Sequence, residues 1–303
     1  EISYNETIVI TPRNYSFQFR KNKEIKNHYA MIGMGIVIDD YPLYFDATNE
    51  KGLSMAGLNF PENADYKPEQ KEADNIAPFE FIPWILGQCA DIQEVKEKLK
   101  RINLVSISFS KSLSLSPLHW IISDKETSIT VECVKDGLKI YDNPVGVLTN
   151  NPTFDMQLFL LNNYMHLSSE IPTNSFSKKL QLKPYSRGMG AMGMPGDLSS
   201  SSRFIRATFT KSNSPKMRSE ERSVAHFFHI LGSVEMCEGS VRVGRKNERT
   251  QYSSCVNVND GIYYYRTYGN SRITAIRMRN ENLDSTNLIS YPIRHKNDIL
   301  FEN

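Results

Sequence analysis

The sequence predicts an α+β fold, because strand-like and helix-like segments come in blocks along the chain rather than in strict alternation. Three observations support this prediction. β-Branched and apolar runs come first, two consecutive helices follow, and a pair of strands joined by a hairpin signal stands near the C-terminus. Length alone allows about two domains. One domain over residues 1–303 is expected, because the long polar stretches resemble loops rather than linkers.

The first strands are expected at residues 7–11, 31–38 and 53–58. Residues 7–11 are β-branched and end before Pro12, and residues 31–38 form an apolar run that contains two glycines. Residues 53–58 are rich in small side chains. Short apolar runs of this kind predict buried strands of one sheet.

A helical block follows. Pro78 predicts the start of a helix over residues 79–88. Asp91 and Glu94 form a capping-box pattern, with Asp91 as N-cap of a second helix. Further helices are expected at residues 155–161, 203–209 and 224–231, the last preceded by the polar run at residues 219–222.

The remaining strands are predicted as antiparallel pairs. Residues 118–123, 127–134 and 138–141 form a meander, and residues 261–267 and 272–278 flank a hairpin turn at 268–271. Polar stretches at 62–75 and 211–222 are expected to be loops.

Composition excludes several classes of function. Thirty-six basic and 34 acidic residues are interspersed, so nucleic-acid binding is not predicted; the one basic cluster, Arg20, Lys21, Lys23 and Lys26, is expected to be a solvated loop. The apolar runs are too short to span a membrane. Four widely spaced cysteines, without metal-ligand spacing, and the lack of a leader-like pattern favour a cytoplasmic protein.

Local motifs do not locate a nucleophile. Residues 188–193 satisfy GxGxxG, but neither a strand before them nor a helix directly after them is predicted, so a glycine-rich loop is favoured over nucleotide binding. His226 and His229 have metal-compatible spacing on one helix, although a packing helix is preferred. His119, at the start of a strand, is expected to be structural, and no GxSxG elbow occurs.

A series of short landmarks runs along nearly the whole chain. In order, they are Thr11-Pro12-Arg13-Asn14, Asp39-Asp40-Tyr41-Pro42, Asn49-Glu50-Lys51-Gly52-Leu53, Ala56-Gly57-Leu58-Asn59-Phe60-Pro61, Leu118-His119-Trp120, Gly146-Val147-Leu148-Thr149-Asn150-Asn151-Pro152, Gly193-Met194-Pro195-Gly196-Asp197, Ser202-Arg203-Phe204 and Gly261-Ile262-Tyr263-Tyr264-Tyr265. From the opening residues 1–5 onward, this order resembles the choloylglycine hydrolase family, and within it the bile salt hydrolases.

The resemblance implies a four-layer αββα sandwich of N-terminal-nucleophile hydrolase type, with two stacked, mainly antiparallel sheets and outer helices. Such enzymes cleave an amide with the thiol of an N-terminal cysteine, whose own α-amine is the general base. Asn59 would contribute its backbone N–H, and Asn150 its side-chain amide, to an oxyanion hole. Arg203 would place a positive charge near the nucleophile. Taken alone, Asn59 could end a strand, Asn150 could shape a turn, and Arg203 could pair with an acid.

The resemblance also implies the substrate. Asn59 stands where penicillin V acylases of this family tend to have tyrosine, which favours glycine- or taurine-conjugated bile salts. The positions that match the family's steroid-contacting loops are all apolar: Ile38, Phe45, Phe109, Leu113 and Leu118. Apolar side chains also project from the serine-rich loop at residues 106–116, which suggests a ligand or a second subunit. A homotetramer in a gut-dwelling bacterium is expected, with no cofactor and no metal.

One part of the family pattern is expected upstream of Glu1. A leading segment of about 20 residues would hold the cysteine nucleophile, an arginine, an aspartate and a central strand. Without it, we expect no hydrolysis and an exposed strand edge. The alternatives are a penicillin V acylase, or a steroid-binding protein that has lost its nucleophile.

Overall fold

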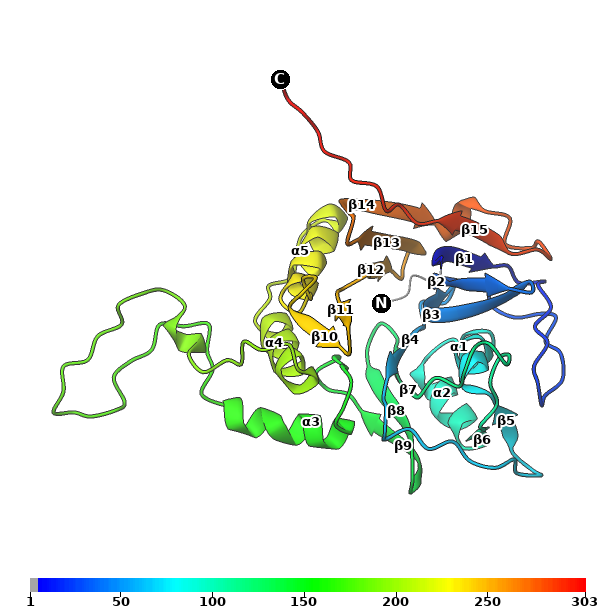
Figure 1. The fold of residues 1–303 in the computed structure, drawn as a ribbon, viewed down its shortest axis with the longest axis horizontal. Coiled ribbons are helices and arrows are strands. Elements are labelled where there is room, and N and C mark those ends of the chain that lie inside the picture. Colours follow the sequence, from blue (N-terminus) through cyan, green and yellow to red (C-terminus); the bar gives the residue numbers. More distant parts are fainter. Residues whose placement is uncertain (1–4) are drawn as a thin grey trace.

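A computed structural model describes residues 5–303, so the opening motif at residues 1–4 lies outside the described chain. Figure 1 shows two β-sheets packed together, with helices on both outer faces. Helices α1 (Phe81–Leu86) and α2 (Ile92–Leu99) cover one sheet, and α4 (Ser200–Ser212) and α5 (Glu220–Gly232) lie on the opposite side of the molecule. The result is the predicted αββα sandwich.

The larger sheet has eight strands, and every neighbouring pair in it is antiparallel. In spatial order they are β15 (Ile289–Pro292), β1 (Thr7–Thr11), β2 (Met31–Ile38), β3 (Tyr41–Asn49), β4 (Ser54–Asn59), β7 (Leu118–Ser123), β8 (Ser128–Val134) and β9 (Gly137–Asp142). The predicted meander at residues 118–141 is therefore confirmed.

The smaller sheet consists of β12 (Tyr252–Asn257), β13 (Ile262–Thr267) and β14 (Asn270–Arg277), also antiparallel. The tight connection between β13 and β14 confirms the predicted hairpin. Successive side chains of β13 point to opposite faces of the smaller sheet, so they contact different layers. Tyr263 and Tyr265 are buried toward the larger sheet, whereas the Tyr264 hydroxyl donates to Glu220 on α5.

The same alternation along β1 divides the core in two. Val9 packs in the cluster beneath α1 and α2, whereas Ile8 and Ile10 pack between the two sheets against Tyr263 and Met278. A strand that is buried on both faces must be apolar at successive positions, which is the pattern of residues 7–11.

The helix caps follow the sequence closely. Asp91 Oδ1 accepts from the Glu94 backbone N–H at 2.9 Å, and Glu94 in turn accepts from the Ala90 N–H at 2.7 Å. Ser199 and Ser219 cap α4 and α5 in the same way. Each cap satisfies an amide that the first helical turn leaves unpaired. The helix predicted at residues 79–88 is shorter: the 3-10 turn η1 (Pro78–Glu80) leads into α1, which ends before Gly87.

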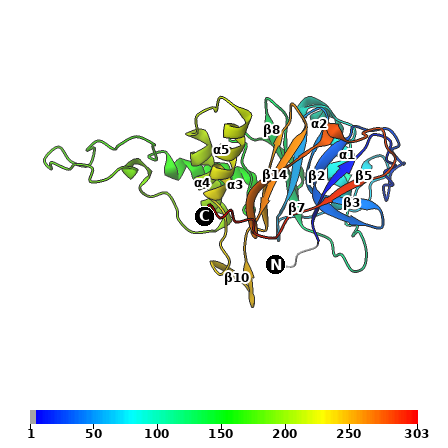
Figure 2. The same cartoon turned by 90° about the horizontal axis from the view of Figure 1, so that it is seen from above.

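The smaller elements complete the chain. They are β5 (Asp74–Ile76) paired with β6 (Ile102–Leu104), the β10 (Val241–Val243) and β11 (Lys246–Glu248) hairpin, α3 (Phe154–Leu160), and the 3-10 turns η2 (Leu161–Tyr164), η3 (Met189–Ala191) and η4 (Met278–Asn280). Residues 165–198 form an arm that projects away from the sandwich (Figures 1 and 2). The GxGxxG stretch lies in this arm around η3, which confirms the predicted loop.

Some expectations need correction. The sequence patterns did not predict β3 or β12, and residues 74 and 75, expected within a loop, belong to β5. The loop predicted at 211–222 is shorter, because α4 extends to Ser212 and α5 begins at Glu220. Of the helices in the described residues, none is long and apolar enough to cross a membrane.

Candidate active site

The three predicted catalytic residues, far apart in sequence, are joined by hydrogen bonds. Asn150 Nδ2 donates to the Asn59 backbone carbonyl at 2.7 Å, and Arg203 Nη2 donates to Asn150 Oδ1 at 2.7 Å. Asn59 ends β4, Asn150 lies in the loop before α3, and Arg203 lies in the first turn of α4. The site thus connects the larger sheet to the helical layer that contains α4.

The backbone of Asn59 faces this junction. Phe60 N–H donates to the Pro117 carbonyl at 2.8 Å, so the neighbouring pair, Asn59 and Leu118, is a non-hydrogen-bonded pair of the β4–β7 ladder. Asn59 therefore turns its N–H and C=O away from β7, as its bond to Asn150 also requires. On that side, the pairing of β3 with β4 ends at Ala56. The Asn59 N–H is thus directed toward the same open side as the Asn150 amide.

Buried hydrogen bonds fix the loop that carries Asn150. Gln157, on α3, is fully buried; its amide donates to the carbonyls of Asn150 at 2.6 Å and Pro152 at 2.8 Å, and accepts from Thr149 Oγ1 at 2.9 Å. The Asn150 N–H donates to Ser200 Oγ at 2.7 Å. Gln157 was not predicted from the sequence, because a single glutamine in an amphipathic helix resembles a solvated residue.

Arg203 supplies a half-buried positive charge. Its Nε donates to the Leu198 carbonyl at 3.1 Å, and its other described hydrogen bond goes to Asn150, an amide rather than a carboxylate. Burial lowers the pKa of the guanidinium, and the charge of Arg206 adds to this effect. An arginine still remains charged at neutral pH, so Asn150 Oδ1 is held by a fixed cation.

The five apolar residues predicted to contact the steroid all pack against the core beneath α1 and α2, and together they are called the apolar wall. Each of Ile38, Phe45, Phe109, Leu113 and Leu118 is partly buried against that core. Leu118 is the direct cross-strand partner of Asn59, so this apolar wall begins beside the polar site. Phe109 packs edge-on against Phe79, with ring centroids 5.3 Å apart.

The loop at residues 106–116 is tied down at both ends. The Tyr66 hydroxyl donates to the Ser116 carbonyl at 2.8 Å and accepts from the Leu118 N–H at 2.8 Å. Arg20 lies over the Phe109 ring at 5.5 Å and donates to the Phe109 carbonyl at 2.9 Å. These contacts hold Phe109 and Leu113 against the wall without covering them completely.

The internal cysteines are poorly suited to nucleophilic attack. Burial raises the pKa of Cys89 and of Cys133 to about 11, and that of Cys255 to about 12, so these groups stay protonated at neutral pH. Cys237 is exposed near the small hairpin, and all four thiols are free. Among residues 5–303, no group of His, Cys, Asp and Glu side chains could hold a metal ion.

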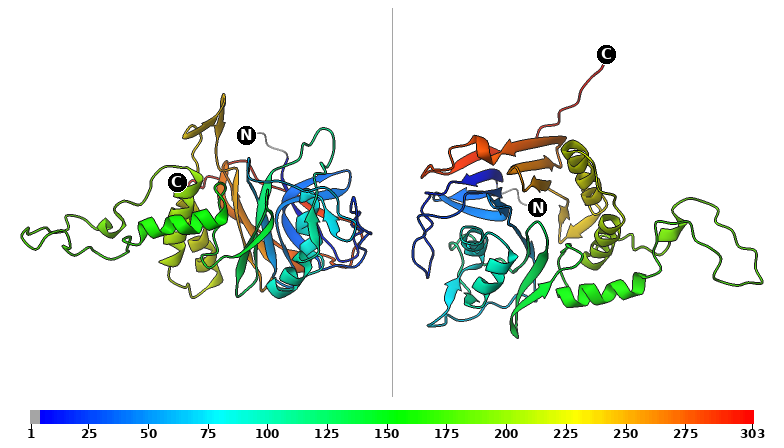
Figure 3. Two further views of the ribbon diagram at one scale, coloured as in Figure 1. Left: turned by 90° about the horizontal axis from the view of Figure 1, so that it is seen from below. Right: turned by 180° about the vertical axis from the view of Figure 1, so that it is seen from behind.

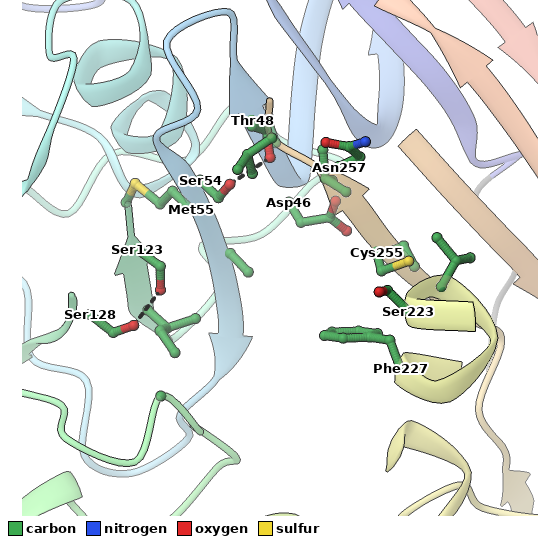
Figure 4. Close-up of a pocket in the computed structure, with 18 of the residues that line it drawn as sticks. Asp46, Thr48, Ser54, Met55, Ser123, Ser128, Ser223, Phe227, Cys255 and Asn257 are labelled. Atoms are coloured by element: carbon green, nitrogen blue, oxygen red, sulfur yellow. Dashed lines mark hydrogen bonds between the residues drawn. The ribbon is translucent and has the colours of Figure 1, made fainter. Parts of the chain in front are cut away.

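A cavity of about 770 Å³ separates the larger sheet from the edge of the smaller one. Figure 4 shows Thr48 and Ser54 on one side of it, and Cys255, Ser223 and Phe227 on the other. Asp46 also lines it and accepts hydrogen bonds from the hydroxyls of Tyr263 at 2.6 Å and Tyr252 at 2.9 Å. Burial raises the pKa of Asp46.

Figure 3 shows the two sheets from further directions. Residues 254–257 of β12 line the cavity. Within the described chain, β12 pairs on one side only, with β13. The cavity therefore lies directly beside an unpaired strand edge.

The fold and the site define a class. An αββα sandwich that directs a backbone N–H and a side-chain amide to one place, beside a half-buried cation, can stabilise an anionic oxygen during acyl transfer. The family described as linear amide C–N hydrolases, choloylglycine hydrolase family, matches residues 1–291. The chain belongs to this family.

Individual relatives agree. The chain is 58% identical to the bile salt hydrolase/transferase of Lactiplantibacillus plantarum, over 97% of this chain and 91% of the relative. It is 42% identical to the corresponding protein of Clostridium perfringens, over 96% and 90% of the two chains. A solved cysteine-to-alanine variant of conjugated bile acid hydrolase from Clostridium perfringens superposes with a TM-score of 0.92, at 39% identity, over 100% and 93%. Penicillin V acylase from Agrobacterium tumefaciens, at 18% identity and TM-score 0.74 over 94% and 83%, shares the fold.

Proposed function

We propose that the protein hydrolyses the amide bond of glycine- or taurine-conjugated bile salts, releasing the free bile acid and the amino acid. The hydrogen-bonded series Asn59, Asn150 and Arg203, beside an apolar wall, is the observation that carries this proposal. A rigid apolar steroid needs such a wall, and its amide needs an oxyanion site at the edge of the wall. The relatives named as bile salt hydrolases support the same substrate class.

We propose further that the nucleophile is an N-terminal cysteine in a segment that precedes Glu1. Its thiol adds to the amide carbonyl, and its α-amine takes the thiol proton. The Asn59 N–H and the free N–H of the Asn150 amide donate to the resulting oxyanion. Collapse expels glycine or taurine, which takes the proton from the amine, and leaves a thioester that water hydrolyses. Arg203 holds Asn150 and favours the neutral amine.

The cavity beside β12 supports the placement of that segment. An extended strand there would pair with the unpartnered edge of β12 and fill the space between the sheets. In this arrangement, residues 1–303 and the leading segment form one domain.

Substrate turnover tests the proposed function. The full-length protein would be incubated with glycocholate, taurocholate and phenoxymethylpenicillin, and released amine measured for each. Faster turnover of the bile salts is expected, because Asn59 and the apolar wall favour them. Preference for phenoxymethylpenicillin would identify a penicillin V acylase. Tight binding of bile salts without product would identify a binding protein. The intact mass of the purified protein tests the leading segment separately. A mass about 2 kDa above that of residues 1–303 would establish the segment.

Phe109→Ala is expected to raise KM for bile salts about tenfold while changing kcat less than about threefold. The ring lies on the wall beside the site, so its loss removes apolar contact made equally with substrate and transition state. Steady-state kinetics on glycocholate measures both constants. Phe301→Ala, at an exposed position near the C-terminus, is the matched control and leaves KM unchanged. An unchanged KM in Phe109→Ala would remove Phe109 from the proposed substrate site.

We also propose that the protein is a homotetramer in the cytoplasm of a gut-dwelling bacterium, where its thiols stay reduced and bile salts are encountered. The projecting arm supports self-association. Its apolar side chains are largely exposed in the single chain, among them Met165, Ile171, Phe176, Leu182 and Tyr185. Exposed apolar groups concentrated on one segment favour a protein interface.

Replacing Phe176, Leu182 and Tyr185 together by serine is expected to shift the protein to a smaller assembly, because the arm loses apolar surface that a neighbouring subunit would bury. Light scattering after size exclusion gives the mass of each species. Serine at Leu300 and Phe301, equally exposed near the C-terminus, is the control. An unchanged mass in the arm variant would exclude the arm as the interface.

A further inference from the structure

A buried histidine contacts the residues next to Asn59 and Asn150 in the sequence. His119, on β7, and Glu132, its cross-strand neighbour on β8, are both completely buried. His119 Nδ1 lies 3.0 Å from Glu132 Oε1, and His119 Nε2 lies 2.9 Å from the Thr149 carbonyl oxygen. Thr149 immediately precedes Asn150, so the imidazole contacts the peptide that leads into the site.

The contact with Thr149 shows which nitrogen of the His119 ring carries a proton. A carbonyl oxygen only accepts, so His119 Nε2 carries a proton and donates it to Thr149. On the other side, Nδ1 lies within hydrogen-bond distance of the Glu132 carboxyl. This contact leaves the Nε2 proton to Thr149.

Glu132 holds the far end of the same loop. Its Oε1 also accepts from the Phe154 N–H, at 3.1 Å, where α3 begins. The pair therefore bonds to Thr149 at one end of the loop and to Phe154 at the other. Asn150 lies between these two attachments.

The ring also contacts the strand that carries Asn59. His119 pairs with Leu58 in the β4–β7 ladder, and its ring is stacked on Phe60 at 4.1 Å with an interplanar angle of 6°. Leu58 and Phe60 are the two neighbours of Asn59. His119 thus pairs through its backbone with the residue before Asn59, and its ring contacts the residue after Asn59 and the residue before Asn150.

We propose that His119, oriented by Glu132, is a positioning residue that sets the Asn150 amide and the Asn59 N–H relative to each other for the oxyanion. This inference rests on the proposed hydrolysis and deepens it. Two donors aimed at one oxygen must keep their separation through the reaction, and small misplacements are costly in rate. His119 is a fully buried side chain that contacts the supporting segments of both donors.

Two substitutions separate the two ring nitrogens. In His119→Gln, the side-chain amide reaches as far as Nε2 and can still donate to Thr149. In His119→Asn, the amide lies near Nδ1 and can reach only Glu132. If the Thr149 contact positions Asn150, His119→Asn lowers kcat for glycocholate about tenfold to hundredfold, whereas His119→Gln stays within about fivefold of the wild type. KM changes less than about threefold in both, because the oxyanion contact is made in the transition state.

His28→Gln is the matched control. His28 is another buried histidine whose ring nitrogens lie 2.8 and 2.9 Å from carbonyl oxygens, but these belong to Tyr29 and Tyr15, far from Asn150 in the fold. It is expected to lower the melting temperature without changing kcat. Phe60→Leu, which keeps an apolar side chain and removes the stacked ring, is expected to lower kcat about threefold.

The experiment uses the full-length protein in a Cys237→Ser background, because this exposed thiol would also react with a thiol reagent. The kcat is then expressed per active site titrated by that reagent. Equal kcat in His119→Asn and His119→Gln, or losses confined to KM or to melting temperature, would overturn the inference. If His119→Asn does not fold, an unchanged kcat in folded Phe60→Leu overturns it instead. A wild-type protein that titrates but does not turn over glycocholate would overturn the proposed function itself, which is a distinct outcome.

Discussion

Asn150→Ala is expected to lower kcat for glycocholate about 10²- to 10³-fold, with a much smaller change in KM. The substitution removes the amide that links Asn59 to Arg203, and with it the N–H proposed to meet the oxyanion. The hydrogen bond from that donor becomes strong only as charge develops on the carbonyl oxygen. Its loss therefore destabilises the transition state and has little effect on substrate binding.

Asn151→Ala provides the control for this prediction. Asn151 Nδ2 donates to the Pro61 carbonyl at 2.7 Å, so this neighbour also holds the end of β4 through an amide. It does not contact Arg203 or Asn59 in the described structure. We expect Asn151→Ala to lower kcat less than about tenfold. Equal losses in the two variants would assign Asn150 to holding the strand rather than to the reaction.

The sequence patterns predicted most elements whose residues signal them locally. Residues 7–11 and 118–123 match β1 and β7 exactly in extent, and the serine caps mark α4 and α5. β3 escaped prediction because Pro42 and Asp46 interrupt its apolar run. The carboxyl of Asp46 is satisfied by Tyr252 and Tyr263, which are 206 and 217 residues away. Such long-range compensation leaves no trace in the local sequence.

The candidate site shows the same limit. The spacing of Asn59, Asn150 and Arg203 in the sequence does not indicate that they lie close together. Only the family resemblance predicted that they share one site. His119 was expected to be structural on its sequence context. Gln157 and Glu132 gave no signal at all, because their partners are backbone groups of a loop whose path depends on the whole sandwich. Residues that hold a loop through its backbone are visible only once that loop is placed.

A polypeptide that begins at Glu1 is expected to show no hydrolysis of conjugated bile salts, whereas a protein that carries the proposed leading cysteine segment is expected to be active. Two effects are combined in this difference. The segment brings the thiol and the α-amine, which none of the four internal cysteines can supply. It also adds a strand to the edge of β12 and fills the cavity between the sheets, so the melting temperature rises by several degrees.

A third protein separates the two effects. The full-length chain with its leading cysteine replaced by alanine keeps the added strand but lacks the thiol. It is expected to melt with the full-length protein and to be as inactive as the polypeptide that begins at Glu1. Calorimetry and glycocholate turnover on all three give the answer. Hydrolysis by the polypeptide that begins at Glu1 would place the nucleophile within residues 1–303. Equal melting temperatures in all three would mean that the cavity beside β12 does not receive the segment.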